Sequence, residues 1–177
     1  MPFVKSEVAL KELGPEKWEL LEPIEYQGRK EKFYVHTGFK TDLASVPRIF
    51  TWLVPRYGKY TKAAIVHDFL CETKPVNRAD ADGLFRRMMR ELNVPFLLRW
   101  MMWAAVRAGS GLQAATFRDV MAWLLVTIPS VIFLLAPAVI VGVWLIVFWL
   151  LESVFFLLLK PFSHKQVNKP KIFIGRQ

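Results

Sequence analysis

The chain has 177 residues, of which 54% are hydrophobic, and it carries a formal net charge of +9. This length predicts one domain plus an appendage, since soluble domains usually have about 100–150 residues. Cys71 is the single cysteine, which excludes an intramolecular disulfide framework. The positive charge is divided between residues 1–119 and residues 160–177, so we expect no nucleic-acid partner. The first residues lack the apolar core of a secretory signal peptide, which predicts an N-terminal part that folds in the cytosol.

Two extended segments come first in the predicted fold. Residues 17–26 and 31–37 alternate partly between apolar and polar positions, as at Phe33 and Val35. The spacer between them holds Gly28 among polar residues, which indicates a β-hairpin or a meander.

The period becomes helical after residue 60, where positions 63, 66, 67 and 70 form one largely apolar stripe. Asn77 is the expected N-cap of a second helix, which Asn93 and Pro95 end. A third helix is predicted over residues 96–107, before a Gly-Ser-Gly linker. We therefore predict an α+β domain in which a β-hairpin or meander packs on about three helices.

A long apolar segment follows, and residues 120–151 contain no ionisable side chain. As a helix this segment would measure about 48 Å, whereas the hydrocarbon core of a bilayer is about 30 Å thick. Pro129 and Pro137 are the expected bends. One solution is a hairpin of two short spans. The other is a single span over about residues 137–157, preceded by a helix in the membrane interface.

Basic residues on both flanks of this segment favour the hairpin, because Lys and Arg near a span tend to stay cytoplasmic. We therefore expect an integral membrane protein in contact with the lipid bilayer, with both its N-terminal domain and its C-terminal tail in the cytoplasm. The predicted boundaries are 1–111 for the domain, 112–119 for a linker, 120–159 for the anchor and 160–177 for a basic tail.

The His67-Asp68 pair on the first helix is the strongest candidate for chemistry. Adjacent residues of a helix point about 100° apart, so both side chains can border one cleft. This pair suits a histidine base beside a carboxylate that binds a divalent metal, which makes Asp68 the candidate metal ligand. Asp82 on the next helix could orient the histidine, and Asp42 with Ser45 could form the rim of a substrate site.

Each of these residues also has a structural interpretation. His67 lies on an apolar stripe, as a hydrogen-bonded core histidine would. Asp82 has Arg78 and Arg86 four residues away on either side, the spacing of a surface ion-pair ladder. Asp42 and Ser45 can cap a turn, because short polar side chains bind backbone N–H groups there, and Cys71 can be a small core residue.

Three motifs in this order carry a resemblance: TDLASVP at residues 41–47, AAIVHDFL at 63–70 and RADADGLF at 78–85. Together they resemble a phage and prophage family known as a domain of unknown function, over about residues 33–109. The resemblance implies a small α+β domain often encoded in phage genomes. The chain departs from the commoner pattern in having Cys71 where tyrosine is expected, and in its long apolar segment.

Two other families share fragments of the pattern. The His-Asp pair with a later Asp is similar to the centre of secreted phospholipases A2, but the calcium loop and the disulfides are missing. The same pair resembles metal-dependent phosphohydrolases of the HD type, which need further metal ligands.

Two functions follow as expectations. The first is a membrane-anchored phage or prophage hydrolase of a cell-envelope component, with His67 as base, Asp68 as electrostatic or metal partner and Asp82 as orienting residue. The second is a non-catalytic, membrane-tethered interaction or structural protein with a membrane-protein partner, in which these three residues join two helices.

Overall fold

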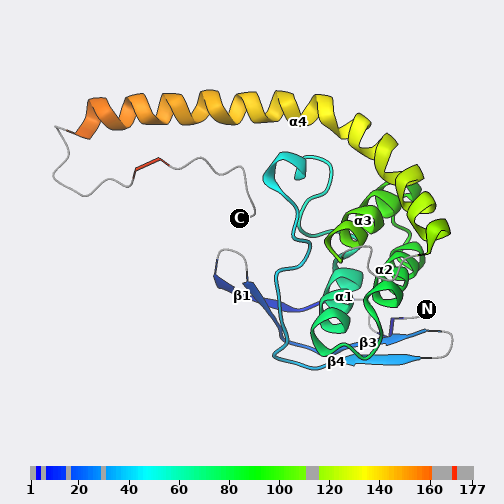
Figure 1. Ribbon diagram of the computed structural model, residues 1–177. Coiled ribbons are helices and arrows are strands. Elements are labelled where there is room, and N and C mark those ends of the chain that lie inside the picture. The colour runs from blue at the N-terminus through cyan, green and yellow to red at the C-terminus, as the bar shows by residue number, and fades with distance from the viewer. Residues whose placement is uncertain are drawn as a thin grey trace.

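The computed structural model describes residues 3–4, 7–14, 17–28, 31–110, 116–160 and 169–170. Five short strands come first and helices follow, which confirms the predicted α+β class (Figure 1). The strands are β1 (Leu10–Gly14), β2 (Lys17–Leu20), β3 (Ile24–Gln27), β4 (Lys32–Val35) and β5 (Lys40–Thr41). The helices are η1 (Arg48–Phe50), α1 (Thr61–Thr73), α2 (Arg78–Glu91), α3 (Phe96–Gly109) and α4 (Phe117–Leu159).

The strands form two small antiparallel sheets, β1-β2-β5 and β3-β4. The extended run expected over residues 17–26 forms two strands, β2 and β3, which are separated around Pro23. Proline has no N–H to donate to a ladder, and the chain changes sheet there. The β3-β4 pair is a hairpin, as predicted, and it pairs Ile24 with Val35 and Tyr26 with Phe33.

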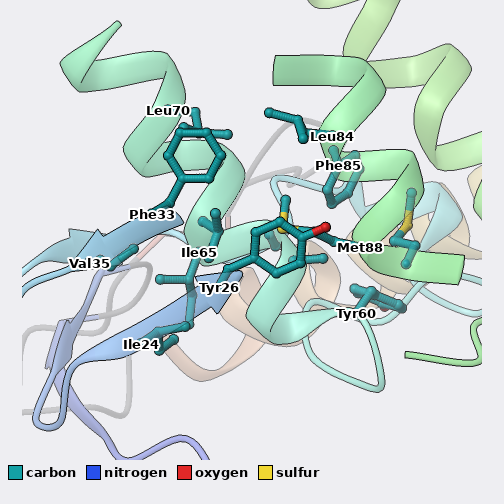
Figure 2. Close-up of a cluster of buried hydrophobic side chains, with 14 of the residues drawn as sticks. Ile24, Tyr26, Phe33, Val35, Tyr60, Ile65, Leu70, Leu84, Phe85 and Met88 are labelled. Atoms are coloured by element: carbon teal, nitrogen blue, oxygen red, sulfur yellow. The ribbon is translucent and has the colours of Figure 1, made fainter. Parts of the chain in front are cut away.

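The core lies between the β3-β4 hairpin and helices α1 and α2 (Figure 2). Side chains two residues apart share one face of a strand, which places Ile24, Tyr26, Phe33 and Val35 together against the helices. The helices contribute Ile65 and Leu70 from α1 and Phe85 and Met88 from α2, each at most 2% exposed. Burial of this apolar surface fixes which faces of α1 and α2 point inward.

The predicted signals bound the helices. Asn77 caps α2 by accepting a hydrogen bond from the Asp80 N–H at 2.8 Å. Asn93 adopts a left-handed φ of 55° after α2, and Pro95 precedes α3. The helical period, the N-cap and the two stop signals therefore located α1, α2 and α3 correctly.

Helix α4 is one continuous helix of 43 residues, so the predicted hairpin is not formed. Pro129 and Pro137 lie inside it, and the segment around them has no Asn, Asp or glycine pair with which to build a tight turn. Its first part curves beside α3 before the helix runs straight (Figure 1). Prolines inside a helix produce a bend of this kind, because each removes one backbone hydrogen bond.

The start of α4 is fastened to the domain. Thr116 and Asp119 form a capping box at its N-terminus. The Trp123 indole N–H donates to the Ala104 carbonyl of α3 at 3.0 Å. Residues 112–115 of the expected linker and most of the expected tail lie outside the described residues, and residues 117–119 belong to α4.

Among the described residues, α4 is the helix that is long and apolar enough to cross a membrane. Its 43 residues correspond to about 65 Å, roughly twice the thickness of a hydrocarbon core. About half of α4 is therefore long enough to cross a bilayer. The other half, which is fastened to α3, can hold the domain.

Candidate functional site

His67 lies at the centre of α1 and points toward α2. Its Nε2 atom is 2.9 Å from Oδ1 of Asp82, so the contact expected between the two residues is present. His67 is 9% exposed and Asp82 is 0% exposed. The imidazole also lies against the ring of Phe85, with 4.9 Å between ring centroids. The pair is therefore enclosed between the two helices.

Helix α3 supplies two further partners to Asp82. The Ser110 hydroxyl lies within hydrogen-bond distance of Oδ1, at 3.1 Å, and of the Val106 carbonyl, at 2.9 Å. Nη1 of Arg107 lies 3.6 Å from Oδ2. Arg107 is only 6% exposed. The surface ion-pair ladder considered for Asp82 is therefore wrong, because its carboxylate is buried and binds α1 and the end of α3. We call His67, Asp82, Arg107 and Ser110 the buried polar cluster.

Sequence reasoning missed Arg107 and Ser110. The available signal was Arg107 in the apolar second half of α3, since a buried guanidinium needs a carboxylate partner. Their spacing of three residues places both on one face of a helix, next to the Gly-Ser-Gly segment that was interpreted only as a linker.

The protonation state of His67 follows from this environment. Burial is the largest single influence and lowers the pKa of the imidazole, but the hydrogen bonds and charges of Asp82 and Cys71 together outweigh burial and raise the pKa to about 9. His67 is therefore an imidazolium at neutral pH. The Cys71 Sγ atom lies 3.6 Å from Nε2 and 3.9 Å from Nδ1, within hydrogen-bond distance for sulfur, so Cys71 is a further partner of the ring.

Asp68 points to a different part of the fold. The Thr41 hydroxyl donates to its Oδ2 at 2.5 Å, and the same Thr41 oxygen accepts from the Leu43 N–H at 2.9 Å. Leu43 has a left-handed φ of 61°. Thr41 thus fixes the start of the TDLASVP segment on α1, which gives this motif a structural role.

The pKa of Asp68 is raised to about 7, mainly by burial of the carboxyl group. The hydrogen bond from Thr41 opposes this shift, and the charge of Asp42 adds to it. Asp42 itself is exposed, and its carboxylate accepts a hydrogen bond from the Ser45 hydroxyl. The two residues expected at a substrate rim are therefore both exposed and hydrogen-bonded to each other, and Asp42 lies near enough to Asp68 for its charge to act there.

The predicted residues therefore divide into two groups. His67 and Asp82 belong to the buried polar cluster, whereas Asp68 lies with Thr41, Asp42 and Ser45. None of the three predicted catalytic residues lines the cavity between α2 and α3 or the smaller one beside Cys71. Among the described residues there is no group of three or more His, Cys, Asp or Glu side chains that could hold a metal ion.

The buried polar cluster joins α1, α2 and α3, with Oδ2 of Asp82 held by the ion pair with Arg107 and not by a hydrogen bond. Removal of one partner of such an ion pair typically costs about 3–5 kcal/mol, because a charge is left buried without compensation. A catalytic group, in contrast, needs contact with substrate, and the enclosed imidazole has none available.

A family model described as a protein of unknown function (DUF1353) matches residues 18–106. A curated relative, the uncharacterized protein y4jT of Sinorhizobium fredii, is 37% identical over 81 residues. This alignment covers 44% of the present chain and 24% of y4jT, so the chain spans about a quarter of the length of that relative. No solved structure matches the chain. The matched region contains the five residues expected to form the site and ends before α4.

Proposed function

The chain belongs to the DUF1353 family, and from its geometry we propose a membrane-anchored interaction or structural protein that has no catalytic histidine. The observation that carries this proposal is the enclosure of His67 as an imidazolium against Asp82 and Phe85. A general base needs a pKa near the working pH and a path to the proton that it removes. His67 is already protonated at neutral pH and is 9% exposed.

The position of the cluster supports a tethering role. Arg107 and Ser110 lie at the end of α3, only a few residues before α4 begins. The charge on Asp82 therefore fixes the end of α3 from which the apolar helix continues, and the bond from Trp123 to Ala104 holds α4 to α3. The cluster and this bond together determine how the α+β domain is held next to the bilayer.

We further propose a single crossing by the distal part of α4. Since α4 is continuous, one crossing puts the α+β domain and the C-terminal tail on opposite sides of the membrane. This replaces the arrangement with both parts in the cytoplasm, which depended on a hairpin. The phage or prophage origin that the resemblance implies stays part of the proposal, and the genes neighbouring the coding sequence test it.

Hydrolysis of an envelope component is a second candidate, and one observation favours it. Asp68 has a pKa of about 7, a value suited to a general acid or base. Thr41 is hydrogen-bonded to it, and Asp42, which is hydrogen-bonded to Ser45, acts on it through its charge. In that case Asp68 would replace His67 as the proton-transfer residue, and a metal would need ligands beyond those that the described residues group together.

The experiment assays the purified full chain in detergent for release of product from peptidoglycan and from bilayer phospholipids. The tethering proposal expects no turnover above that of the Asp68→Asn variant, in the presence or absence of divalent metal. Turnover lost in Asp68→Asn, with an unchanged melting temperature, would overturn it in favour of the hydrolase.

A further inference from the structure

A cationic groove lies between α2 and α3, away from the buried polar cluster. It has a volume of about 780 Å³, and its walls include Arg86, Arg87 and Arg90 from α2 and Arg99 from α3. Two acidic residues, Glu31 and Asp80, also line it. Four guanidinium groups against two carboxylates leave the groove positively charged.

Two of these arginines, Arg86 and Arg99, stack on aromatic rings. The Arg86 guanidinium carbon lies 4.2 Å from the centroid of the Trp100 ring and 5.6 Å from that of Trp103. Arg99 lies 5.5 Å from the centroid of the Phe96 ring. Stacking of this kind leaves the N–H groups at the edges of a guanidinium free for an anion.

The positive charge in the groove is not neutralised by the part of the protein that the structure describes. Within that part Arg86, Arg90 and Arg99 form no ion pair with a carboxylate, and Asp80 accepts a hydrogen bond from the Asn77 amide instead. Burial, together with the charges of Arg90 and Arg99, lowers the pKa of Arg86. This effect of like charges is what a bound anion would relieve.

Apolar side chains stand next to these charges. Phe96, which lines the groove, is 63% exposed, and its neighbour Leu97 is 73% exposed. Both lie in the first turn of α3, the helix whose other end continues toward α4. Guanidinium groups beside exposed aromatic and aliphatic side chains match a bilayer interface, where phosphates lie next to acyl chains.

We propose that this groove binds the phosphate headgroup of an anionic phospholipid, with Phe96 and Leu97 inserted at the acyl-chain boundary. The inference rests on the proposed membrane anchoring, which keeps the domain beside lipid at a high effective concentration. A free phosphate offers the same anion, but it gives no role to the two exposed apolar side chains. The groove thus supplies a second contact with the bilayer in addition to α4.

The experiment uses the full chain in a neutral detergent, titrated with short-chain phosphatidylglycerol, short-chain phosphatidylcholine or inorganic phosphate. Binding is followed by the shift in melting temperature. Phosphatidylglycerol is expected to give a saturable rise, and the other two are expected to give little. In the Arg90→Gln, Arg99→Gln double variant the lipid should bind roughly 30-fold more weakly, as estimated for the loss of two basic contacts with an anionic lipid.

A matched control removes two positive charges elsewhere, at Lys17 and Lys59, both exposed. The Lys17→Gln, Lys59→Gln variant should bind phosphatidylglycerol as the wild type does. An equal loss in this control would mean general charge attraction and would overturn the groove. Binding of inorganic phosphate as tight as that of the lipid would overturn the lipid assignment. The lipid titration is made in detergent, so its result does not depend on membrane insertion or on catalysis. Carbonate extraction and the hydrolysis assay test those two parts of the proposed function separately.

Discussion

Oδ2 of Asp82 lies 3.6 Å from Nη1 of Arg107, while Oδ1 of the same carboxylate is bound to His67. One buried side chain on α2 therefore holds a cation from α1 on one oxygen and a cation from α3 on the other. Each cation depends on Asp82 for its charge compensation, and Asp82 is 0% exposed. Loss of any member should accordingly affect the whole helical part of the domain.

The first prediction concerns the His67→Ala variant. The change removes a buried ring and one partner of Asp82, so we expect a loss of about 2–4 kcal/mol in the free energy of unfolding. For a domain of this size the melting temperature should fall by roughly 10 °C or more, measured by circular dichroism or fluorescence. The matched control is His36→Ala, since His36 is exposed and packs only at the edges of Phe39 and Phe69. Equal melting temperatures for the two variants would refute a structural role for His67.

The second prediction is a pH dependence due to His67. Its pKa is about 9 in the folded chain and 6.5 in an ordinary environment, so the folded state binds the proton more tightly. The resulting stabilisation is fully present below about pH 6.5 and is lost as pH rises through 9. This difference in pKa corresponds to about 3 kcal/mol. The stability difference between wild type and His67→Ala should therefore shrink between pH 6.5 and 9, and a constant difference would contradict it.

The third prediction concerns Asp68, an acid whose raised pKa also makes stability fall as pH rises. Burial raises the pKa of Asp68 to about 7, so between pH 4 and 7 the folded chain holds a proton that the unfolded chain has lost. Stability should fall as pH rises through this window. Asp68→Asn keeps the shape without the charge, and it should become more stable than the wild type as pH approaches 7 and beyond.

A second variant checks the cause of this shift. The charge of Asp42 contributes to the raised pKa of Asp68, so Asp42→Asn should move the window to lower pH. Thermal melts of the three proteins from pH 4 to 8 provide the measurement. If Asp68→Asn is destabilising at pH 8, the ionised carboxylate makes a favourable contact in the folded chain, and the predicted pH dependence is wrong.

The helices could be predicted because their signals are local. A largely apolar stripe with the period of a helix, the Asn77 cap and Pro95 act within a few residues of where they stand. Strands β1 and β5 were missed, since β5 has two residues and owes its existence to pairing with β2. The anchor hairpin was favoured because basic residues flank both ends of the apolar segment, with Pro137 as its bend. Proline only removes a hydrogen bond, however, and a reversal also needs turn residues.

Half of the candidate site could be predicted from the sequence. The contact between His67 and Asp82 follows from two neighbouring helices whose inward faces are defined by their apolar positions. Arg107 could not be assigned to the core in the same way, because α3 carries apolar residues on most of its faces. Which face points inward is decided by the packing of α3 on α2 and α4. The separation of Asp68 from His67 depends on the TDLASVP segment, whose path is set by Thr41 and the left-handed Leu43.

The last prediction concerns the membrane and the point at which the domain can be cut. The full chain should stay with membranes after carbonate extraction, and reporters fused to its two termini should be accessible from opposite sides, as one crossing by α4 requires. A chain that ends at Ser110 should be soluble and folded, whereas one that ends at Gly109 should melt at a lower temperature. The shorter chain lacks Ser110 and therefore the hydrogen bond between its hydroxyl and the Asp82 carboxylate. Such a bond is worth about 1–3 kcal/mol when the acceptor is a buried charge. Reporters on the same side would restore the hairpin, and equal melting of the two truncated chains would show that the cluster ends at Arg107.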